Sequence, residues 1–490
     1  MRDPGRARRE AAVARFCHSL VAATFDLSMH APKSRYPEDA IRTLLLDLRL
    51  AADEGVRMPL EIAFGRDCMQ HEGAVLKGPS LQARRLLDLC AEREIDSISF
   101  DPRVEADELA RFFALLLDPK SRQGLWRPHR DRVLMAMGIR HLKIGTREAH
   151  GSIDPSRSAC RADADLVHYQ NLADCLQESH LRARQDRDLP VDHAQGAVEQ
   201  ALLRLESEPS GLLALAAQDN VDRFTVGHSV RVALLALQVA RAVGADRRQL
   251  VRVGTASLLH DIGKSKIPQE ILFKPGRLDP EEWAWMAQHP RLGAQILLEQ
   301  DEIDRSAVGA AFCHHMRPSG EGYYPLPALP MRPSGTSRLV RICDVFEALT
   351  SIRPYKRALT PCEAYAVMLR QPRDFDPEWL SVFVRTLGLF PLGSRVTLDD
   401  GSMGQVIRQT DDPRRPVVKL LLGPDGEDLV PDAPDEVAIG RDRRIAEVLA
   451  HDRSVPLPDE DPCDPQILTQ PFGSHACIDP HPMGGDSPSA

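Results

Sequence analysis

The sequence contains no apolar run long enough to cross a membrane and no cysteine pair at metal-binding spacing. A membrane-spanning helix needs roughly 18 to 20 apolar residues, whereas the apolar stretch at residues 16–27 is interrupted by His18 and Asp26. Neither an integral membrane protein nor an exported one is therefore expected. The ten cysteines are scattered without a C-x-x-C spacing, which argues against a cysteine zinc site or disulfide framework and favours reduced thiols in the cytoplasm.

A basic surplus is also missing. The chain has 62 Lys and Arg against 71 Asp and Glu, a net charge of −9, so we do not expect a protein that binds duplex nucleic acid. A small phosphorylated ligand remains compatible with this charge, because a local basic cluster is enough to bind one. The length of 490 residues is sufficient for about three domains of ordinary size.

Changes in the residue pattern divide the chain into five parts and predict a multidomain fold class. These are an N-terminal α+β domain with a regulatory or sensor-like role (1–149), a linker (150–163), a central all-α helical bundle (164–388), a small C-terminal β module (389–447) and a disordered tail (448–490). Helical periodicity marks residues 38–52, 80–93 and 106–117. Alternating patterns predict strands at residues 60–64, 74–77, 95–100, 394–398, 404–408 and 417–422.

Histidine is sparse over much of the chain, and its positions carry the functional argument. Between residues 219 and 450 there are only five, most of them on or beside apolar helical segments: His228, His260, His289, His314 and His315. Two carboxylates, Asp261 and Asp344, lie beside similar segments. A buried His/Asp cluster is costly unless hydrogen bonds or a metal satisfy it. Imidazole and carboxylate without thiolate suit Fe, Mn, Co, Ni or Zn.

The local sequence predicts where these residues lie on their helices. His260 and Asp261 would end a helix that Gly263 terminates. Asp279 would cap the next helix, with Pro280 in its first turn and Glu282 completing a capping box, so that His289 lies two turns in. Asp344 ends an apolar run and would begin a further helix. A carboxylate such as Asp261 can bridge two metal ions, an arrangement that cleaves phosphoesters.

These motifs, taken in order, resemble the HD-GYP phosphohydrolases over roughly residues 190–385. The matching segments are HDIGK at 260–264, DRFT-x-x-HS at 222–229, IP-x-x-IL at 267–272, HP at 289–290, CDVF at 343–346 and RPYK at 353–356. The resemblance implies an all-α HD-type bundle that hydrolyses cyclic di-GMP with a two- or three-metal centre. It implies that the metal ligands are His228, His260, Asp261, His289, His314, His315 and Asp344.

The same resemblance assigns the remaining roles. Asp261 would bridge the ions and act in catalysis with Lys264, which would also hold a phosphate oxygen of the substrate. Tyr323, the tyrosine of the GYP signature, and Arg353 and Lys356, from the R-P-Y-[RK] segment, would contact substrate.

Several positions depart from the family pattern. Met316 replaces the acid after the paired histidines, Ser319 replaces an aspartate, Tyr324 lengthens the GYP turn and Glu347 replaces an aspartate. Phe224 stands where three-metal members carry glutamate, which favours two divalent transition-metal ions, iron or manganese before cobalt, nickel or zinc. All first-sphere ligands are retained, so we expect a working centre, whereas the altered loop affects substrate binding.

The expected function is therefore a cytoplasmic, metal-dependent phosphodiesterase that opens cyclic di-GMP to linear pGpG, with GMP as an open further product. Two alternatives remain at this point. One is a catalytically weak or inactive receptor or interaction module, and the other is a phosphohydrolase for a different cyclic dinucleotide or nucleotide. A homodimer, and signalling proteins bound through the N-terminal domain, are also left open.

Overall fold

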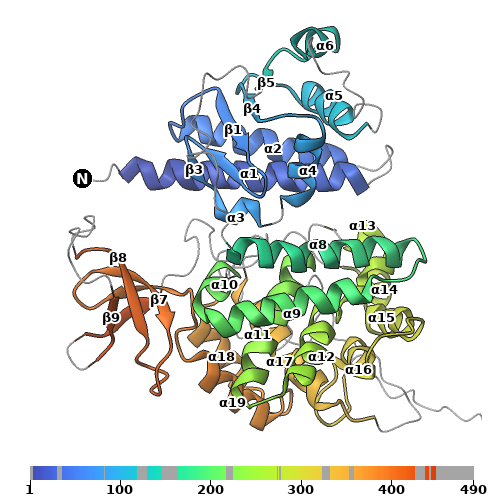
Figure 1. Ribbon diagram of the computed structural model, residues 1–490, viewed down its shortest axis with the longest axis vertical. Coiled ribbons are helices and arrows are strands. Elements are labelled where there is room, and N and C mark those ends of the chain that lie inside the picture. Colours follow the sequence, from blue (N-terminus) through green and yellow to red (C-terminus); the bar gives the residue numbers. More distant parts are fainter. Residues whose placement is uncertain are drawn as a thin grey trace, which may run out of the picture.

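The computed structural model describes three structural units in one chain (Figure 1). An N-terminal α+β unit is followed by a helical unit and a C-terminal antiparallel sheet. The described residues are 4–29, 36–81, 83–118, 130–145, 164–216, 225–272, 274, 278–322, 331–351, 358–424, 436–440 and 443–448. The predicted linker and nearly all of the predicted tail lie outside these residues.

The N-terminal unit is an antiparallel sheet with helices packed against it. Its elements are α1 (Pro4–Met29), α2 (Tyr36–Asp53), β1 (Leu60–Phe64), β2 (Met69–His71), β3 (Ala74–Val75), α3 (Lys77–Ser80), α4 (Arg84–Glu92), β4 (Ser97–Phe100), α5 (Ala106–Leu117), α6 (Arg130–Ala136) and β5 (Leu142–Gly145). The described strands run in the order β3-β2-β1-β4-β5. In β1, Leu60, Ile62 and Phe64 are buried while Glu61 is exposed, which is the alternation that a half-buried strand requires.

The predicted strand at residues 74–77 is too long, and β2 was missed. Strand β3 ends at Val75 and Lys77 already begins α3. β3 pairs with β2, which in turn pairs with β1. Three-residue and two-residue strands carry too little alternation for a sequence pattern to separate them from turns.

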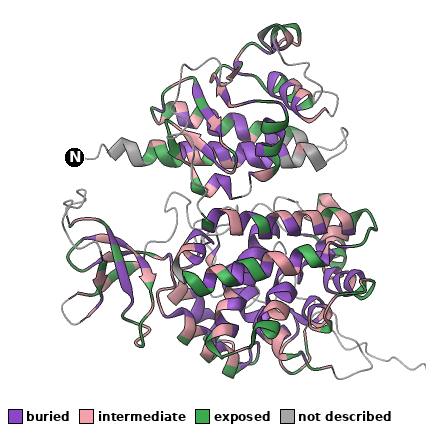
Figure 2. Ribbon diagram, viewed as in Figure 1, coloured by how far each residue is buried: buried purple, intermediate pink, exposed green. Residues whose placement is uncertain are grey.

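The helical unit holds the predicted site. Its elements are α8 (Ala164–Arg184), α9 (Val191–Ser207), α10 (Pro209–Ala216), α11 (Thr225–Ala242), α12 (Arg247–Leu258), the 3-10 helix η2 (Ile262–Lys266), α13 (Gln269–Leu272), α14 (Pro280–Met286), α15 (His289–Leu298), α16 (Arg305–Cys313), α17 (Gly335–Thr350), α18 (Pro361–Leu369) and α19 (Pro377–Leu387). Helix α11 is central because it is apolar on almost every face, with Val230, Val232 and Leu234 fully buried. Figure 2 shows the buried residues concentrated inside this unit.

Three predicted helix boundaries are wrong. The capping box of Asp279 and Glu282 is present, but α14 ends at Met286 and His289 is the first residue of α15. Pro290 explains the break, because proline lacks the N–H that would continue α14. Asp344 lies inside α17 rather than at its start. Gly263 belongs to η2 and does not cap α12.

The C-terminal unit is an antiparallel sheet in the order β10-β6-β7-β8-β9. Its strands are β6 (Arg395–Leu398), β7 (Met403–Arg408), β8 (Val417–Leu422), β9 (Glu436–Ala438) and β10 (Ile445–Val448). The three strands predicted for this part correspond to β6, β7 and β8. Val396, Val406 and Val418 form its small core. We refer to these five strands as the β module.

Helix α8 connects the N-terminal unit with the rest of the chain and lies between them in Figure 1. The Gln170 amide on α8 donates hydrogen bonds to the carbonyl oxygens of Asp67 (3.0 Å) and Ser80 (2.7 Å). Helix α8 also contacts η2, which directly follows His260 and Asp261. Within the described residues, none of the helices has the length and apolar character of a membrane span.

Candidate metal centre

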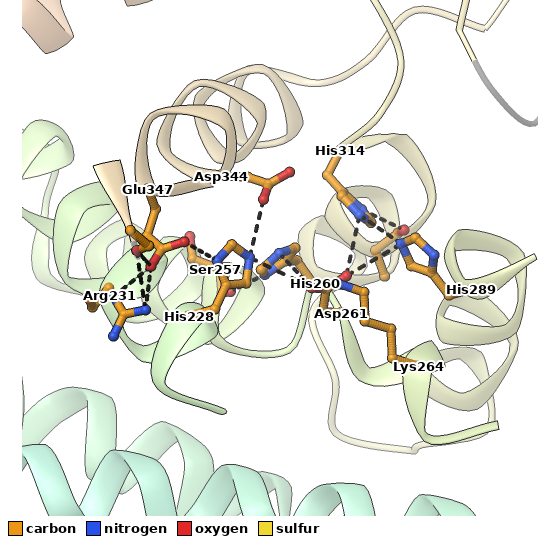
Figure 3. Close-up of polar contacts among 12 residues, drawn as sticks. His228, Arg231, Ser257, His260, Asp261, Lys264, His289, His314, Asp344 and Glu347 are labelled. Atoms are coloured by element: carbon orange, nitrogen blue, oxygen red, sulfur yellow. Dashed lines mark hydrogen bonds and ion pairs between the residues drawn. The ribbon is translucent and has the colours of Figure 1, made fainter. Parts of the chain in front are cut away.

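Five segments of the helical unit bring the predicted ligands together (Figure 3). His228 comes from α11, the His260–Asp261 pair from the turn between α12 and η2, His289 from the start of α15, and Asp344 from the middle of α17. His314 and His315 directly follow α16. Six of these seven side chains are buried, at most 3% exposed, and His315 is half-buried.

Asp261 occupies the centre of this cluster. Its Oδ1 lies 3.3 Å from His289 Nε2 and 3.6 Å from His314 Nε2. Its Oδ2 lies 3.5 Å from His260 Nε2 and 3.7 Å from His228 Nε2. Each carboxylate oxygen therefore faces a different pair of imidazoles, which is the arrangement expected of a carboxylate that bridges two cations.

Three of the imidazoles are oriented by the same local device. His260 Nδ1 donates to the Ser257 carbonyl (2.7 Å), His289 Nδ1 to that of Met286 (2.8 Å) and His314 Nδ1 to that of Ala311 (2.9 Å). In each case the acceptor is three residues earlier, in the last turn of a helix, where carbonyl oxygens lack an intrahelical partner. Because a carbonyl only accepts, Nδ1 carries the proton and Nε2 presents a lone pair to the centre.

His228 is held by a separate network. Its Nδ1 donates to Glu347 Oε2, and its Nε2 lies 3.1 Å from Asp344 Oδ1. The other Glu347 oxygen accepts hydrogen bonds from Arg231 Nε (2.6 Å) and from the Ser351 hydroxyl. Glu347, noted in the sequence only as a departure, thus orients a ligand from 119 positions away.

The donor set fits divalent cations. His289 Nε2 and His314 Nε2 lie only 3.2 Å apart, although the tautomers above leave both with lone pairs. His260 Nε2 and Asp261 Oδ1 are buried and have no hydrogen-bond partner among the described residues. Such atoms are costly unless something positive lies between them. Three subsets have ligand atoms within 4.8 Å of one another: His289, His314 and His315; His228, His260 and Asp261; His260, His314 and Asp344.

Burial keeps the imidazoles of His289 and His314 in the neutral form that binds metal. It lowers the pKa of His289 to about 3 and that of His314 to about 4. Burial alone would raise the pKa of Asp261, but the charge of Lys264 holds it well below its ordinary value. Asp261 is thus an anion beside the neutral nitrogen donors of His289 and His314, which favours cation binding.

Metal-free protein is expected to lose stability on acidification. Unfolded histidines protonate near pH 6.5, whereas folded His289 and His314 stay neutral down to about pH 3 and 4. The unfolded state therefore binds more protons between about pH 6.5 and pH 4, and the free energy of unfolding falls there by up to about 1.4 kcal/mol per pH unit for each histidine. Urea unfolding of chelator-treated protein across this range measures the slope, and a flat profile would contradict neutral buried imidazoles.

The contribution of His228 to stability changes with pH in the opposite direction. Burial lowers its pKa, but Glu347 and Asp344 outweigh burial and raise the pKa to about 9. Its contribution to stability is complete below about pH 6.5 and is lost as the pH rises through 9. A metal ion on this imidazole must displace its proton, which favours metal binding at higher pH.

Replacement of Glu347 with glutamine is expected to weaken metal binding by about 10- to 100-fold, the usual effect of losing a partner that orients a ligand. The amide removes the charge that fixes His228 and leaves Arg231 unneutralised. Titration of Mn²⁺ into chelator-treated protein measures the dissociation constant. Glu281→Gln, at an exposed position on α14, is the control, and equal affinity in the two variants would refute this role.

Lys264 lies beside the centre in a buried position. Its Nζ donates a 2.5 Å hydrogen bond to Asp261 Oδ2. In this structure it therefore neutralises the bridging carboxylate rather than pointing into solvent. The other predicted substrate contacts, Tyr323, Arg353 and Lys356, lie outside the described residues, as do Phe224 and Tyr324.

The described part of the altered signature loop, residues 314–322, forms a turn held by a backbone bridge. Met316 is buried and forms an antiparallel bridge with Gly322, while Arg317 Nε lies 2.7 Å from Asp374. Gly322 is required at this point, because its φ is +139° and a Cβ there would meet the His315 carbonyl oxygen at 2.7 Å. Met316 thus supplies packing where the family pattern has an acid.

His180 on α8 is a residue that the sequence reasoning missed. Its Nε2 is buried without a hydrogen-bond partner among the described residues. Burial lowers its pKa to about 4, and the charges of Asp261, Lys264 and His260 act on it. His180 lies outside the segment 219–450 that holds the five predicted histidines, and only the packing of α8 on η2 brings it near them.

Known proteins match the part of the chain that contains the predicted ligands. Residues 211–379 match the family model described as HD domain. The central unit is therefore an HD domain, and the resemblance inferred from the motifs is confirmed. The order of the units also agrees with the prediction: an N-terminal α+β region, a mostly helical central unit and a C-terminal antiparallel sheet.

Three curated relatives show where the similarity lies. A cyclic di-GMP phosphodiesterase of Pseudomonas aeruginosa is 34% identical over 227 residues, 46% of this chain and 55% of the relative. A cyclic di-GMP phosphodiesterase response regulator of Xanthomonas campestris is 32% identical, covering 47% of this chain and 64% of the relative. A 3′3′-cGAMP-specific phosphodiesterase of Vibrio cholerae is 33% identical, covering 34% and 36%. The chain thus spans about half the length of the first of these relatives.

Proposed function

We propose that this protein is a metal-dependent phosphodiesterase that hydrolyses cyclic di-GMP to linear pGpG. The observation that carries the proposal is the position of Asp261, whose two carboxylate oxygens each face a separate pair of imidazoles. Relatives named as cyclic di-GMP phosphodiesterases match the same part of the chain. The described cysteines are free, in keeping with a reducing cytoplasmic location.

In this proposal the seven predicted ligands, with Asp261 at their centre, would hold two divalent ions. When bound, the ions supply the positive charge that polarises a phosphodiester and activates water. The protein's own residues fix the imidazoles through helix-terminal carbonyls and through Glu347, so that little reorganisation is needed when the site is loaded. Iron or manganese is favoured, since imidazole and carboxylate donors suit both.

Lys264 would stabilise the substrate. Its ammonium donates to Asp261 Oδ2 in this structure, and in the loaded site it would leave that oxygen and contact a non-bridging phosphate oxygen of the substrate. Its buried position makes that contact stronger than it would be in water.

Replacement of Lys264 with alanine is therefore expected to lower turnover by about 100-fold or more while leaving the amount of bound metal unchanged. Steady-state kinetics and elemental analysis of the same preparation measure both quantities. Lys266→Ala is the matched control, because Lys266 lies only two residues after Lys264 but pairs with the exposed Asp186. Parallel loss of metal in Lys264→Ala would mean that the lysine serves the metal site instead of the substrate.

The test of the function is a hydrolysis assay on protein loaded with Fe²⁺ or Mn²⁺, with separation of cyclic di-GMP, pGpG and GMP. Linear product that is absent without metal is the expected result, and no turnover with Fe, Mn, Co or Ni would reject the proposal. A second substrate, 3′3′-cGAMP, belongs in the same assay, because relatives named as specific for it are 33% and 34% identical to this chain. Preference for cGAMP would reassign the substrate but not the reaction.

A further inference from the structure

A cavity separate from the predicted metal centre lies beside the helical unit. It measures about 140 Å³, is partly open to solvent, and is lined by residues of α10, α11, α17, the start of α18 and the β module. The β module lies on the α10 and α18 side of the helical unit in Figure 1. Most of the lining is apolar, including Leu234 and Leu235 of α11, Phe346 of α17, Leu392 and Val448. We refer to this space as the α11–β6 cavity.

One end of the α11–β6 cavity is formed by the network that holds His228. Arg231, Glu347 and Ser351 all line the cavity. Glu347 uses one oxygen to accept from His228 Nδ1 and the other to accept from Arg231 and Ser351. A molecule in the cavity would therefore contact the residues that orient a predicted metal ligand.

The charge of the lining is positive. Arg231 and Glu347 neutralise each other, whereas Arg395, at the beginning of β6, is exposed and has no ion-pair partner among the described residues. Two arginines against one glutamate give a net charge of +1. Such a lining favours a single negative charge on the occupant, placed where the Arg395 guanidinium can reach it.

The volume limits the size of the occupant. An apolar cavity of about 150 Å³ accommodates a benzene-sized molecule, so a space of about 140 Å³ holds a body of roughly six carbon atoms. A cyclic dinucleotide is several times larger and cannot be contained in it. The cavity is therefore distinct from a substrate site.

We propose that the α11–β6 cavity binds a small monocarboxylate with an apolar body of about six carbon atoms. The apolar body lies among Leu234, Leu235 and Phe346, and the carboxylate pairs with Arg395. Occupancy alters metal affinity through Arg231, Glu347 and His228. Binding of the carboxylate itself does not depend on the proposed phosphodiesterase activity, so the two proposals can fail independently.

Calorimetric titration of the full-length chain with hexanoate tests the site, with hexan-1-ol as the uncharged probe of equal length. Saturable binding of hexanoate with a dissociation constant of about 1 mM or tighter is expected. Arg395→Gln should weaken hexanoate by about tenfold and leave hexanol unchanged. Leu235→Phe, which fills the cavity, should abolish binding of both probes, whereas Leu203→Phe, at a 44% exposed position on α9, should leave it intact.

Absence of saturable hexanoate binding to the wild-type protein would overturn the site, as would binding that survives Leu235→Phe in a folded variant. Circular dichroism establishes that this variant folds, and Arg395→Gln gives an independent answer because its side chain is exposed. The link to the metal is measured by Mn²⁺ titration with and without saturating hexanoate. A change in the Mn²⁺ dissociation constant of about threefold or more is expected, and it should vanish in Glu347→Gln. An equal constant in both conditions would overturn the link.

Discussion

Replacement of Asp261 with asparagine is expected to lower cyclic di-GMP turnover by about a thousandfold or more and to deplete the protein of metal. The amide is nearly isosteric but removes the charge, and its nitrogen cannot act as a metal ligand. Both imidazole pairs that face Asp261 would then lack the shared anion that joins them. A thousandfold loss corresponds to about 4 kcal/mol of transition-state stabilisation, within the range of a charge acting directly at the reaction centre.

Elemental analysis and a product assay on the same sample measure the two effects together. Asp186→Asn is the matched control, because Asp186 is exposed, pairs with Lys266 and has a φ of +54° that asparagine also tolerates. We expect this control to keep wild-type metal content and turnover. An Asp261→Asn protein that retained both would remove the basis of the proposed mechanism.

Replacement of Gly263 with alanine is expected to destabilise the protein by about 3 kcal/mol or more. A Cβ at this position would lie 2.0 Å from the His289 carbonyl oxygen and 2.5 Å from the Gly293 backbone nitrogen. Both are backbone atoms, so η2 and α15 would have to separate. Because Asp261 directly precedes η2 and His289 begins α15, metal binding should weaken as well.

Gly196→Ala is the control for this substitution. Gly196 lies within α9, and nothing lies within 4 Å of a Cβ added there. Alanine in an open helical position should be stabilising by about 0.5–1 kcal/mol. Chemical denaturation should therefore give changes of opposite sign for the two variants. Equal stabilities would show that η2 and α15 do not approach closely.

Gly263 was predicted to matter, but for a different physical reason from the one that the structure shows. A glycine shortly after a helical His-Asp pair is typical of a helix end, and that was its predicted role. The structure gives a different reason, the contact between two backbones. Nothing local to residue 263 indicates that α15 will lie against it.

The helix position predicted for His289 is also partly right and partly wrong. The capping box at Asp279 is local, and the structure confirms it. The interruption before Pro290 is also a local effect, yet the prediction extended the helix across it. The consequence is functional: Pro290 cannot donate to the Met286 carbonyl, so that oxygen accepts from His289 Nδ1 instead.

Residue types and their order along the chain are enough to name the candidate side chains and the chemistry that they suit. Imidazoles and carboxylates beside apolar helical segments, in the order of the HD-GYP motifs, are sufficient to predict an HD domain, and that prediction is confirmed. The ligand roles of His228, His260, Asp261, His289, His314, His315 and Asp344 remain predictions that the Asp261 experiment tests. Residue types and spacing carry this information because helix ends and donor chemistry are local properties.

How these residues are held in place became visible only in the folded chain. It placed Glu347 against His228 across 119 positions, added His180 from a helix upstream of the HD domain, and formed the α11–β6 cavity between two units of the chain. Each depends on contacts between segments far apart in the sequence, and a periodicity of two or 3.6 residues says nothing about which segments meet. The free energy of burying apolar helix faces settles that choice, because it depends on the whole packed core.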